Sequence, residues 1–81
     1  MFFVYILYSP SLTKFYVGHT QEVQKRIGQH NAGKGNFTST GIPWTLVTQI
    51  ECLTKSEAML LELKIKKRGI RRYLSDNGIS L

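Results

Sequence analysis

Residues 2–20 read FFVYILYSPSLTKFYVGHT and contain two apolar segments separated by a polar break. The first segment, Phe2 to Tyr8, is rich in aromatic and β-branched residues, which favour a buried strand. Ser9-Pro10-Ser11 ends this segment, because proline removes a ladder donor and serine favours turns. Lys14 to Thr20 is typical of a second strand, so the whole stretch predicts a β-hairpin with a short loop.

A short helix and a loop are predicted next. Glu22 to Asn31 has helical periodicity, with Thr20 as a plausible N-cap and Val23 and Ile27 as the apolar seam. The polar, glycine-containing stretch Gly33 to Pro43 predicts an exposed loop of about ten residues, a length that is usually functional or mobile.

The remaining elements complete an α+β pattern. Trp44 to Leu53 predicts a third strand, and the capping box of Thr54 and Glu57 opens a helix that runs to about Lys67. Gly69 interrupts the helical pattern, and Ile70 to Ser75 predicts a last short helix. The order strand, strand, helix, strand, helix, helix indicates an α+β domain, with a small three-stranded antiparallel sheet flanked by helices.

Size and composition predict one small globular domain over residues 1–81. The longest apolar stretch, Phe2 to Tyr8, is too short to span a bilayer, and no charged leader with a cleavage site precedes it. The single cysteine, Cys52, is expected to be a small core residue and fits a reducing compartment. We therefore expect a cytoplasmic protein that does not associate with membranes.

The charge is unevenly distributed. Eleven basic and five acidic residues give a formal charge of +6. A short segment contains six of the basic residues: Lys64, Lys66, Lys67, Arg68, Arg71 and Arg72. Such a cluster attracts polyanions and suits a phosphate backbone, although a solvated helix face would have the same composition.

Two tyrosines, Tyr5 and Tyr16, are candidates for chemistry because they lie on neighbouring strands of the predicted hairpin. Side chains on one face of such a pair meet across it, so the two phenols could orient a water molecule or a phosphate oxygen. The alternative is structural, since tyrosine is common in strands.

Arg26 and His30 are four positions apart on the predicted short helix and therefore share a face. Arginine can form a forked hydrogen bond to phosphate, and histidine can hold the phosphate or transfer a proton near neutral pH. An exposed helical pair without a function is the alternative.

Glu62 is the candidate carboxylate. It lies beside Ala58 and Ile65 on the helical wheel, where burial is costly unless the group is paired or metal-bound. The competing interpretation is a surface salt bridge to Lys66.

Five landmarks occur in a recognisable order: Phe3-Val4-Tyr5, Tyr16-Val17-Gly18, Arg26, His30 and Glu62. Together they resemble the GIY-YIG nuclease superfamily in its small stand-alone bacterial form, over Phe3 to about Lys67. By resemblance, the relatives include the amino-terminal domain of the bacterial excision-repair incision subunit, homing endonucleases and a junction nuclease.

The resemblance implies hydrolysis of phosphodiester bonds with one divalent ion, Mg²⁺ or Mn²⁺, held by Glu62. It implies that Tyr5 and Tyr16 position or deprotonate the attacking water, and that Arg26 and His30 engage the phosphate. We expect these five side chains to converge around one cation-sized cleft.

Gly18 and His19 lie in and directly after the second tyrosine triplet. Gly18 would permit close approach beside Tyr16, and His19 stands where the repair relative has lysine. His19 is therefore a possible basic partner of the tyrosines.

Our first hypothesis is thus a metal-dependent DNA endonuclease with a role in DNA repair or recombination. The residues expected to contact DNA are basic: Lys34, Lys64, Lys66, Lys67, Arg68, Arg71 and Arg72. The alternative is a non-catalytic nucleic-acid-binding module that retains the fold, and a third hypothesis is an adaptor protein that does not bind nucleic acid.

Overall fold

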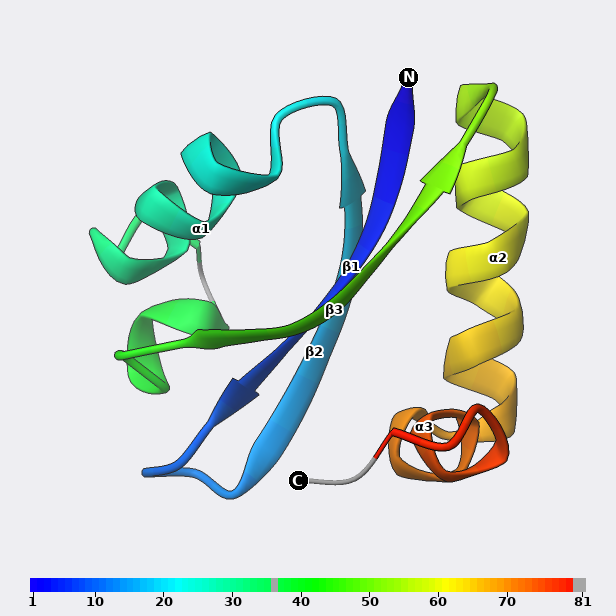
Figure 1. Ribbon diagram of the computed structural model, residues 1–81. Helices are drawn as coiled ribbons and strands as arrows, with labels where there is room; N and C mark the ends of the chain where they lie inside the picture. Colours follow the sequence, from blue (N-terminus) through cyan, green and yellow to red (C-terminus); the bar gives the residue numbers. More distant parts are fainter. Residues whose placement is uncertain (36, 80–81) are drawn as a thin grey trace.

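The computed structural model describes residues 1–35 and 37–79 and confirms the α+β prediction (Figure 1). Three strands, three α-helices and one 3₁₀ helix, η1, follow one another in this described part of the chain. Their bounds are β1 Phe2–Ser9, β2 Lys14–Thr20, α1 Val23–Asn31, η1 Thr38–Thr40, β3 Thr45–Cys52, α2 Lys55–Arg68 and α3 Ile70–Asp76.

The strands form one antiparallel sheet in the order β2-β1-β3. The predicted hairpin is confirmed, with Tyr5 paired to Gly18 and Leu7 paired to Tyr16. β1 is central and apolar along most of its length because β2 and β3 flank it on both sides and helices cover both of its faces. β2 is consequently an edge strand, and this position matters for the site described below.

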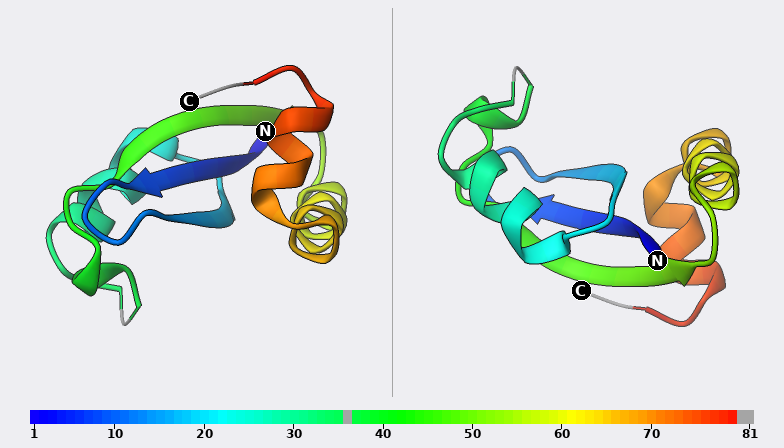
Figure 2. Two further views of the ribbon diagram at one scale, coloured as in Figure 1. Left: turned by 90° about the horizontal axis from the view of Figure 1, so that it is seen from below. Right: turned by 90° about the horizontal axis from the view of Figure 1, so that it is seen from above.

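Helices cover the two faces of the sheet separately (Figures 1 and 2). Alternate β1 residues point to opposite faces, as the period of a strand requires. Tyr5 and Leu7 pack with Val23 of α1 on one face, whereas Val4 and Ile6 belong to the core beneath α2 and α3 on the other.

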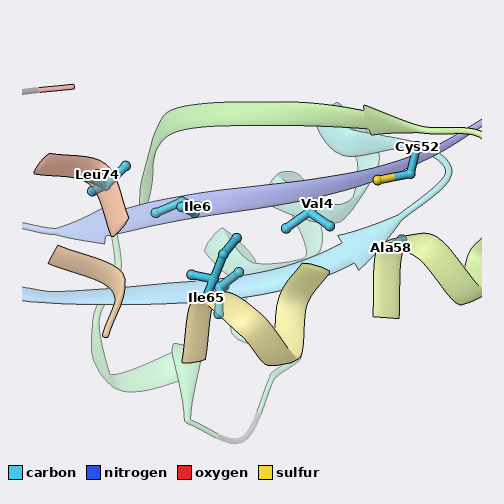
Figure 3. Close-up of a cluster of buried hydrophobic side chains, with 7 residues drawn as sticks. Val4, Ile6, Cys52, Ala58, Ile65 and Leu74 are labelled. Atoms are coloured by element: carbon cyan, nitrogen blue, oxygen red, sulfur yellow. The ribbon is translucent and has the colours of Figure 1, made fainter. Parts of the chain in front are cut away.

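The core on the α2 side is the more apolar of the two (Figure 3). Ala58 and Ile65 lie seven positions apart on α2 and are both fully buried against the sheet, and Leu74 of α3 closes the same cluster. Cys52 is free and buried among these side chains, so the prediction that it is a small core residue is confirmed.

Substitution of Ile65 by alanine is expected to lower the free energy of unfolding by about 2–5 kcal/mol, because it leaves a cavity between α2 and the sheet. Urea denaturation measures this change. Leu60→Ala is the matched control on the same helix: Leu60 is 68% exposed, so its loss should change the free energy of unfolding by less than about 0.5 kcal/mol. Equal effects of the two substitutions would contradict the assigned core.

The capping box at the start of α2 is confirmed. The Thr54 hydroxyl accepts a hydrogen bond from the Glu57 N–H at 3.1 Å, and the Glu57 carboxylate accepts one from the Leu53 N–H at 3.2 Å. Gly69 then separates α2 from α3 with a φ of 95°, a left-handed conformation that favours glycine. No helix within residues 1–35 and 37–79 is long and apolar enough to cross a membrane.

Two local predictions were wrong. α1 begins at Val23 with Glu22 as N-cap and has no side-chain cap, because the Thr20 hydroxyl instead accepts from the Glu22 N–H two residues away. The stretch from Gly33 to Pro43 is not uniformly exposed: it includes η1, whose first residue, Thr38, is buried. The hydroxyl and the carbonyl of Thr38 have hydrogen-bond partners inside the protein, which residue type alone does not reveal.

Candidate active site

The two candidate tyrosines meet across the hairpin, as predicted. Their residues are diagonal neighbours in the register, and the ring centroids of Tyr5 and Tyr16 are 6.4 Å apart. Gly18, directly opposite Tyr5, has no side chain, and a Cβ there would lie 2.6 Å from the Tyr5 hydroxyl. The group that approaches Gly18 closely is therefore the Tyr5 phenol, on the strand opposite.

His30 is buried beside the tyrosines, because α1 places it on the same face as Val23 and Ile27. Its Nε2 lies 2.9 Å from the Tyr5 hydroxyl, and its Nδ1 lies 2.8 Å from the Thr38 hydroxyl. Burial, followed by the positive charge of Arg26, holds the pKa of His30 below its usual value. With both ring nitrogens engaged, His30 is placed to exchange a proton with Tyr5 rather than to hold a phosphate.

Arg26 remains exposed on the same helix and donates a hydrogen bond to Gln29 Oε1 at 3.0 Å. Burial raises the pKa of the Tyr5 phenol, and Arg26, which interacts with this phenol, lowers it by less. The pKa of Tyr5 therefore lies above its ordinary value. A hollow of about 490 Å³ opens at this point, and its lining consists of His19, Thr20, Glu22, Lys25, Arg26 and Gln29. Guanidinium and ammonium groups in an open hollow can bind a phosphate.

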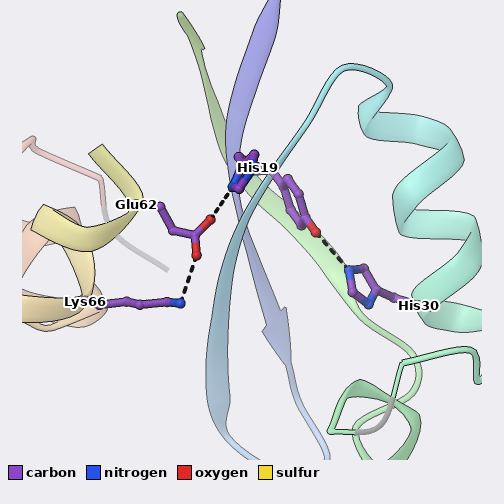
Figure 4. Close-up of polar contacts among 5 residues, drawn as sticks. His19, His30, Glu62 and Lys66 are labelled. Atoms are coloured by element: carbon purple, nitrogen blue, oxygen red, sulfur yellow. Dashed lines mark hydrogen bonds and ion pairs between the residues drawn. The ribbon is translucent and has the colours of Figure 1, made fainter. Parts of the chain in front are cut away.

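Glu62 and His19 form the second half of the site (Figure 4). The His19 Nδ1 lies 2.7 Å from one Glu62 carboxylate oxygen, and the Lys66 ammonium lies 2.8 Å from the other. Burial raises the pKa of Glu62, but hydrogen bonds from Lys66 and His19 outweigh it and hold the pKa below its usual value. The salt bridge to Lys66, offered as the competing interpretation, is present, and it leaves Glu62 ionised.

Glu62 approaches from the side of the sheet opposite to Tyr5. α2 covers one face and α1 the other, but β2 is an edge strand, so side chains from both faces can meet around it. His19 lines the hollow of Arg26 and also a hollow of about 250 Å³ beside Glu62. The single cleft expected from the sequence is thus divided into two hollows that share His19.

Electrostatic interactions link the two hollows around β2. The negative charge of Glu62 contributes to the raised pKa of Tyr5, after the larger effects of burial, Arg26 and Tyr16. The pKa of Lys66 is raised mainly by its hydrogen bond to Glu62 and also by Tyr16. The Glu62 carboxylate therefore influences the Tyr5 phenol even though no hydrogen bond between them is present among the described residues.

The candidate site offers few protein ligands for a metal ion. Among residues 1–35 and 37–79, no group of three or more His, Cys, Asp or Glu side chains could hold a metal. Mg²⁺ is commonly bound through one or two carboxylates, waters and substrate phosphates rather than by a complete protein cage. Glu62 fits that mode of binding, provided that the ion displaces Lys66 or His19 from an oxygen.

The basic residues predicted to contact DNA are all exposed: Lys34, Lys64, Lys66, Lys67, Arg68, Arg71 and Arg72. Three of them have partners within the protein. Lys66 pairs with Glu62, Arg68 donates two hydrogen bonds to Asp76, and the Arg71 guanidinium lies 5.0 Å from the centre of the Phe15 ring.

Sequence reasoning missed Thr38 and Trp44. Trp44 is buried beside the tyrosines, with its ring centroid 6.2 Å from that of Tyr16, and its indole N–H donates to the Thr38 carbonyl at 2.6 Å. A threonine in a polar, glycine-containing stretch carries no signal of burial. The single tryptophan at the end of that stretch was the available hint, because a large aromatic residue needs a core to pack against.

Comparisons with known proteins agree with this architecture. Residues 1–73 match the family model described as GIY-YIG catalytic domain. The UPF0213 protein YsiG of Lactococcus lactis subsp. lactis is 35% identical over 72 residues, which cover 88% of this chain and 68% of YsiG. The UPF0213 protein SH2523 of Staphylococcus haemolyticus is 50% identical over 52 residues, 63% of each chain. The chain thus spans about two thirds of the length of these relatives.

A solved structure has the same fold. The solution NMR structure of the UPF0213 protein BH0048 from Bacillus halodurans superimposes with a TM-score of 0.59 at 32% identity, covering 99% of this chain and 86% of that one.

Proposed function

We propose that this chain, which belongs to the GIY-YIG catalytic domain family, is a metal-dependent endonuclease that hydrolyses phosphodiester bonds in DNA. Members of this family are generally endonucleases and act on nucleic acid. The observation that carries the proposal is the arrangement around edge strand β2, where Tyr5, which also interacts with Arg26 on one side, comes within electrostatic reach of Glu62 on the other.

In this proposal the residues on the α1 face handle the phosphate and the proton. Arg26 binds a phosphate oxygen in the open hollow and offsets the charge that develops on it. Tyr5 passes its proton to His30 Nε2, and the resulting phenolate accepts a proton from the attacking water. Tyr16, which packs edge-on against His30, confines the water to one side of the phenol.

On the α2 face, Glu62 would hold one Mg²⁺ or Mn²⁺ ion. Bound there, the ion would supply Lewis-acid stabilisation of the leaving oxygen. Lys66 and His19 each occupy one oxygen of the Glu62 carboxylate. An arriving phosphate would attract Lys66 and so free the carboxylate oxygen that Lys66 occupies for the ion.

Substitution of Lys66 by methionine is therefore expected to tighten Mn²⁺ binding about tenfold, because it removes a positive charge and a competing donor from Glu62. Titration of the metal-free protein, followed by electron paramagnetic resonance of free Mn²⁺, measures this change. Lys64→Met removes the same charge from an exposed position on α2 and should leave the affinity within about twofold. Weaker Mn²⁺ binding by Lys66→Met would instead show that Lys66 orients the carboxylate.

Plasmid nicking tests the proposed activity directly. Supercoiled DNA is incubated with the protein and Mg²⁺, Mn²⁺ or EDTA, and we expect conversion to the nicked form with either ion and none with EDTA. Absence of nicking with every divalent ion, in protein that still binds DNA, would contradict the proposal.

One observation favours the second candidate, a non-catalytic nucleic-acid-binding module. Both Glu62 oxygens are already satisfied by His19 and Lys66, which is how a purely structural carboxylate would be arranged. That module would bind DNA with a steep salt dependence and without cleavage.

A further inference from the structure

Thr38 is held at both of its polar ends beside the proposed active site. It begins η1 and is only 2% exposed. Its carbonyl oxygen accepts the indole N–H of buried Trp44 at 2.6 Å, and its hydroxyl lies 2.8 Å from His30 Nδ1. The residue therefore has little freedom to turn its hydroxyl away from His30.

Gly35 makes this contact possible. A Cβ at Gly35 would collide with the Thr38 hydroxyl and would also lie 3.3 Å from His30 Nδ1. The backbone thus packs directly against the hydrogen-bonded pair and excludes other partners from that side. The fold enforces the Thr38–His30 contact rather than merely permitting it.

The hydrogen bonds around Tyr5 determine which ring nitrogen of His30 carries a proton. The Tyr5 hydroxyl has His30 Nε2 as its hydrogen-bond partner, and the positive charge of Arg26 acts on the same phenol. A cation favours the arrangement in which the phenol oxygen turns its lone pairs toward it and its proton toward His30. His30 Nε2, at 2.9 Å, is then the acceptor of that proton and must be unprotonated. In neutral imidazole the proton then resides on Nδ1, and the Thr38 hydroxyl oxygen accepts it.

We propose that Thr38 is a positioning residue that fixes His30 in the Nδ1–H tautomer and so keeps Nε2 ready to take the proton of Tyr5. When that proton moves, Tyr5 becomes a phenolate and His30 an imidazolium whose Nδ1–H stays on the Thr38 oxygen. The kinetic part of this inference rests on the proposed nuclease activity, whereas the tautomer does not.

Long-range ¹H–¹⁵N correlation spectra of the imidazole rings in the metal-free protein report the tautomer directly. We expect wild-type His30 to be Nδ1–H at neutral pH and Thr38→Val to populate the Nε2–H form. In nicking assays, Thr38→Val should lower kcat about tenfold with KM unchanged, and Thr38→Ser should restore kcat to within about twofold. Thr45→Val, which removes the hydrogen bond from an exposed threonine hydroxyl to the Tyr8 carbonyl, should change neither quantity.

A wild-type His30 in the Nε2–H tautomer would overturn the inference without any variant, even if Thr38→Val fails to fold. So would a folded Thr38→Val protein that keeps the wild-type tautomer and kcat. If wild-type protein shows the Nδ1–H tautomer, and Thr38→Val shifts it, but no DNA is nicked, the proposed function fails while the positioning of His30 by Thr38 stands.

Discussion

Replacing Glu62 with glutamine is expected to reduce Mg²⁺-dependent nicking at least about 100-fold while DNA binding survives. Glutamine preserves the shape of the side chain and removes the negative charge. Among residues 1–35 and 37–79, Glu62 is the carboxylate whose charge acts on the Tyr5 phenol, and no cluster of three or more His, Cys, Asp or Glu side chains is present to hold the ion in its place. Mn²⁺ affinity, measured by electron paramagnetic resonance, should fall about tenfold or more in the same variant.

Glu51→Gln is the matched control, because Glu51 is an exposed residue of β3 and the charge change is identical. Nicking by this variant should equal that of the wild type. Fluorescence anisotropy with labelled duplex should show DNA affinity for Glu62→Gln equal to or slightly tighter than wild type, since a negative charge has been removed. Wild-type nicking by Glu62→Gln would refute the assignment of Glu62 to the metal.

The order of the strands and α-helices could be predicted from the sequence because the signals for these elements are local. The aromatic and β-branched segment Phe2 to Tyr8, the break at Ser9-Pro10-Ser11 and the capping box of Thr54 each act over a few residues, and the strand, the turn and the helix start are found where predicted. The start of α1 was misplaced because the Thr20 hydroxyl has two possible backbone partners, the ordinary N-cap donor and the Glu22 N–H, and the sequence does not distinguish them.

The candidate site was less predictable because it depends on contacts between distant segments. Tyr5 and Tyr16 could be paired from the hairpin alone, since strand register is a local consequence of the turn. β2 is the edge strand because β3 joins the sheet beside β1, and the sequence did not specify that position of β3. Nor did the sequence specify that α1 and α2 cover opposite faces. The hydrogen bond between His30 and Thr38 depends on the path of the intervening loop, for which no periodic pattern exists.

Removal of one oxygen atom, by Tyr5→Phe, is expected to lower kcat for nicking about 100-fold or more with little change in KM. Burial is the main cause that holds the pKa of Tyr5 above its ordinary value, so the phenol keeps its proton at neutral pH and needs His30 to take it. Phenylalanine can neither give a proton to His30 nor accept one from water. Single-turnover nicking measures the loss at the chemical step.

The same substitution has a structural cost that must be separated from the kinetic one. It leaves His30 Nε2 buried without its partner, which should destabilise the protein by about 1–3 kcal/mol. Tyr8→Phe removes an equivalent hydroxyl from β1, where the ring packs against Phe15, and should change neither kcat nor the free energy of unfolding by much. Urea denaturation measures the loss of stability, and thermal denaturation identifies the temperature at which Tyr5→Phe remains folded. If kcat there equals that of Tyr8→Phe, the phenol of Tyr5 takes no part in proton transfer, and the hydrogen bond to His30 serves only to hold α1 against the sheet.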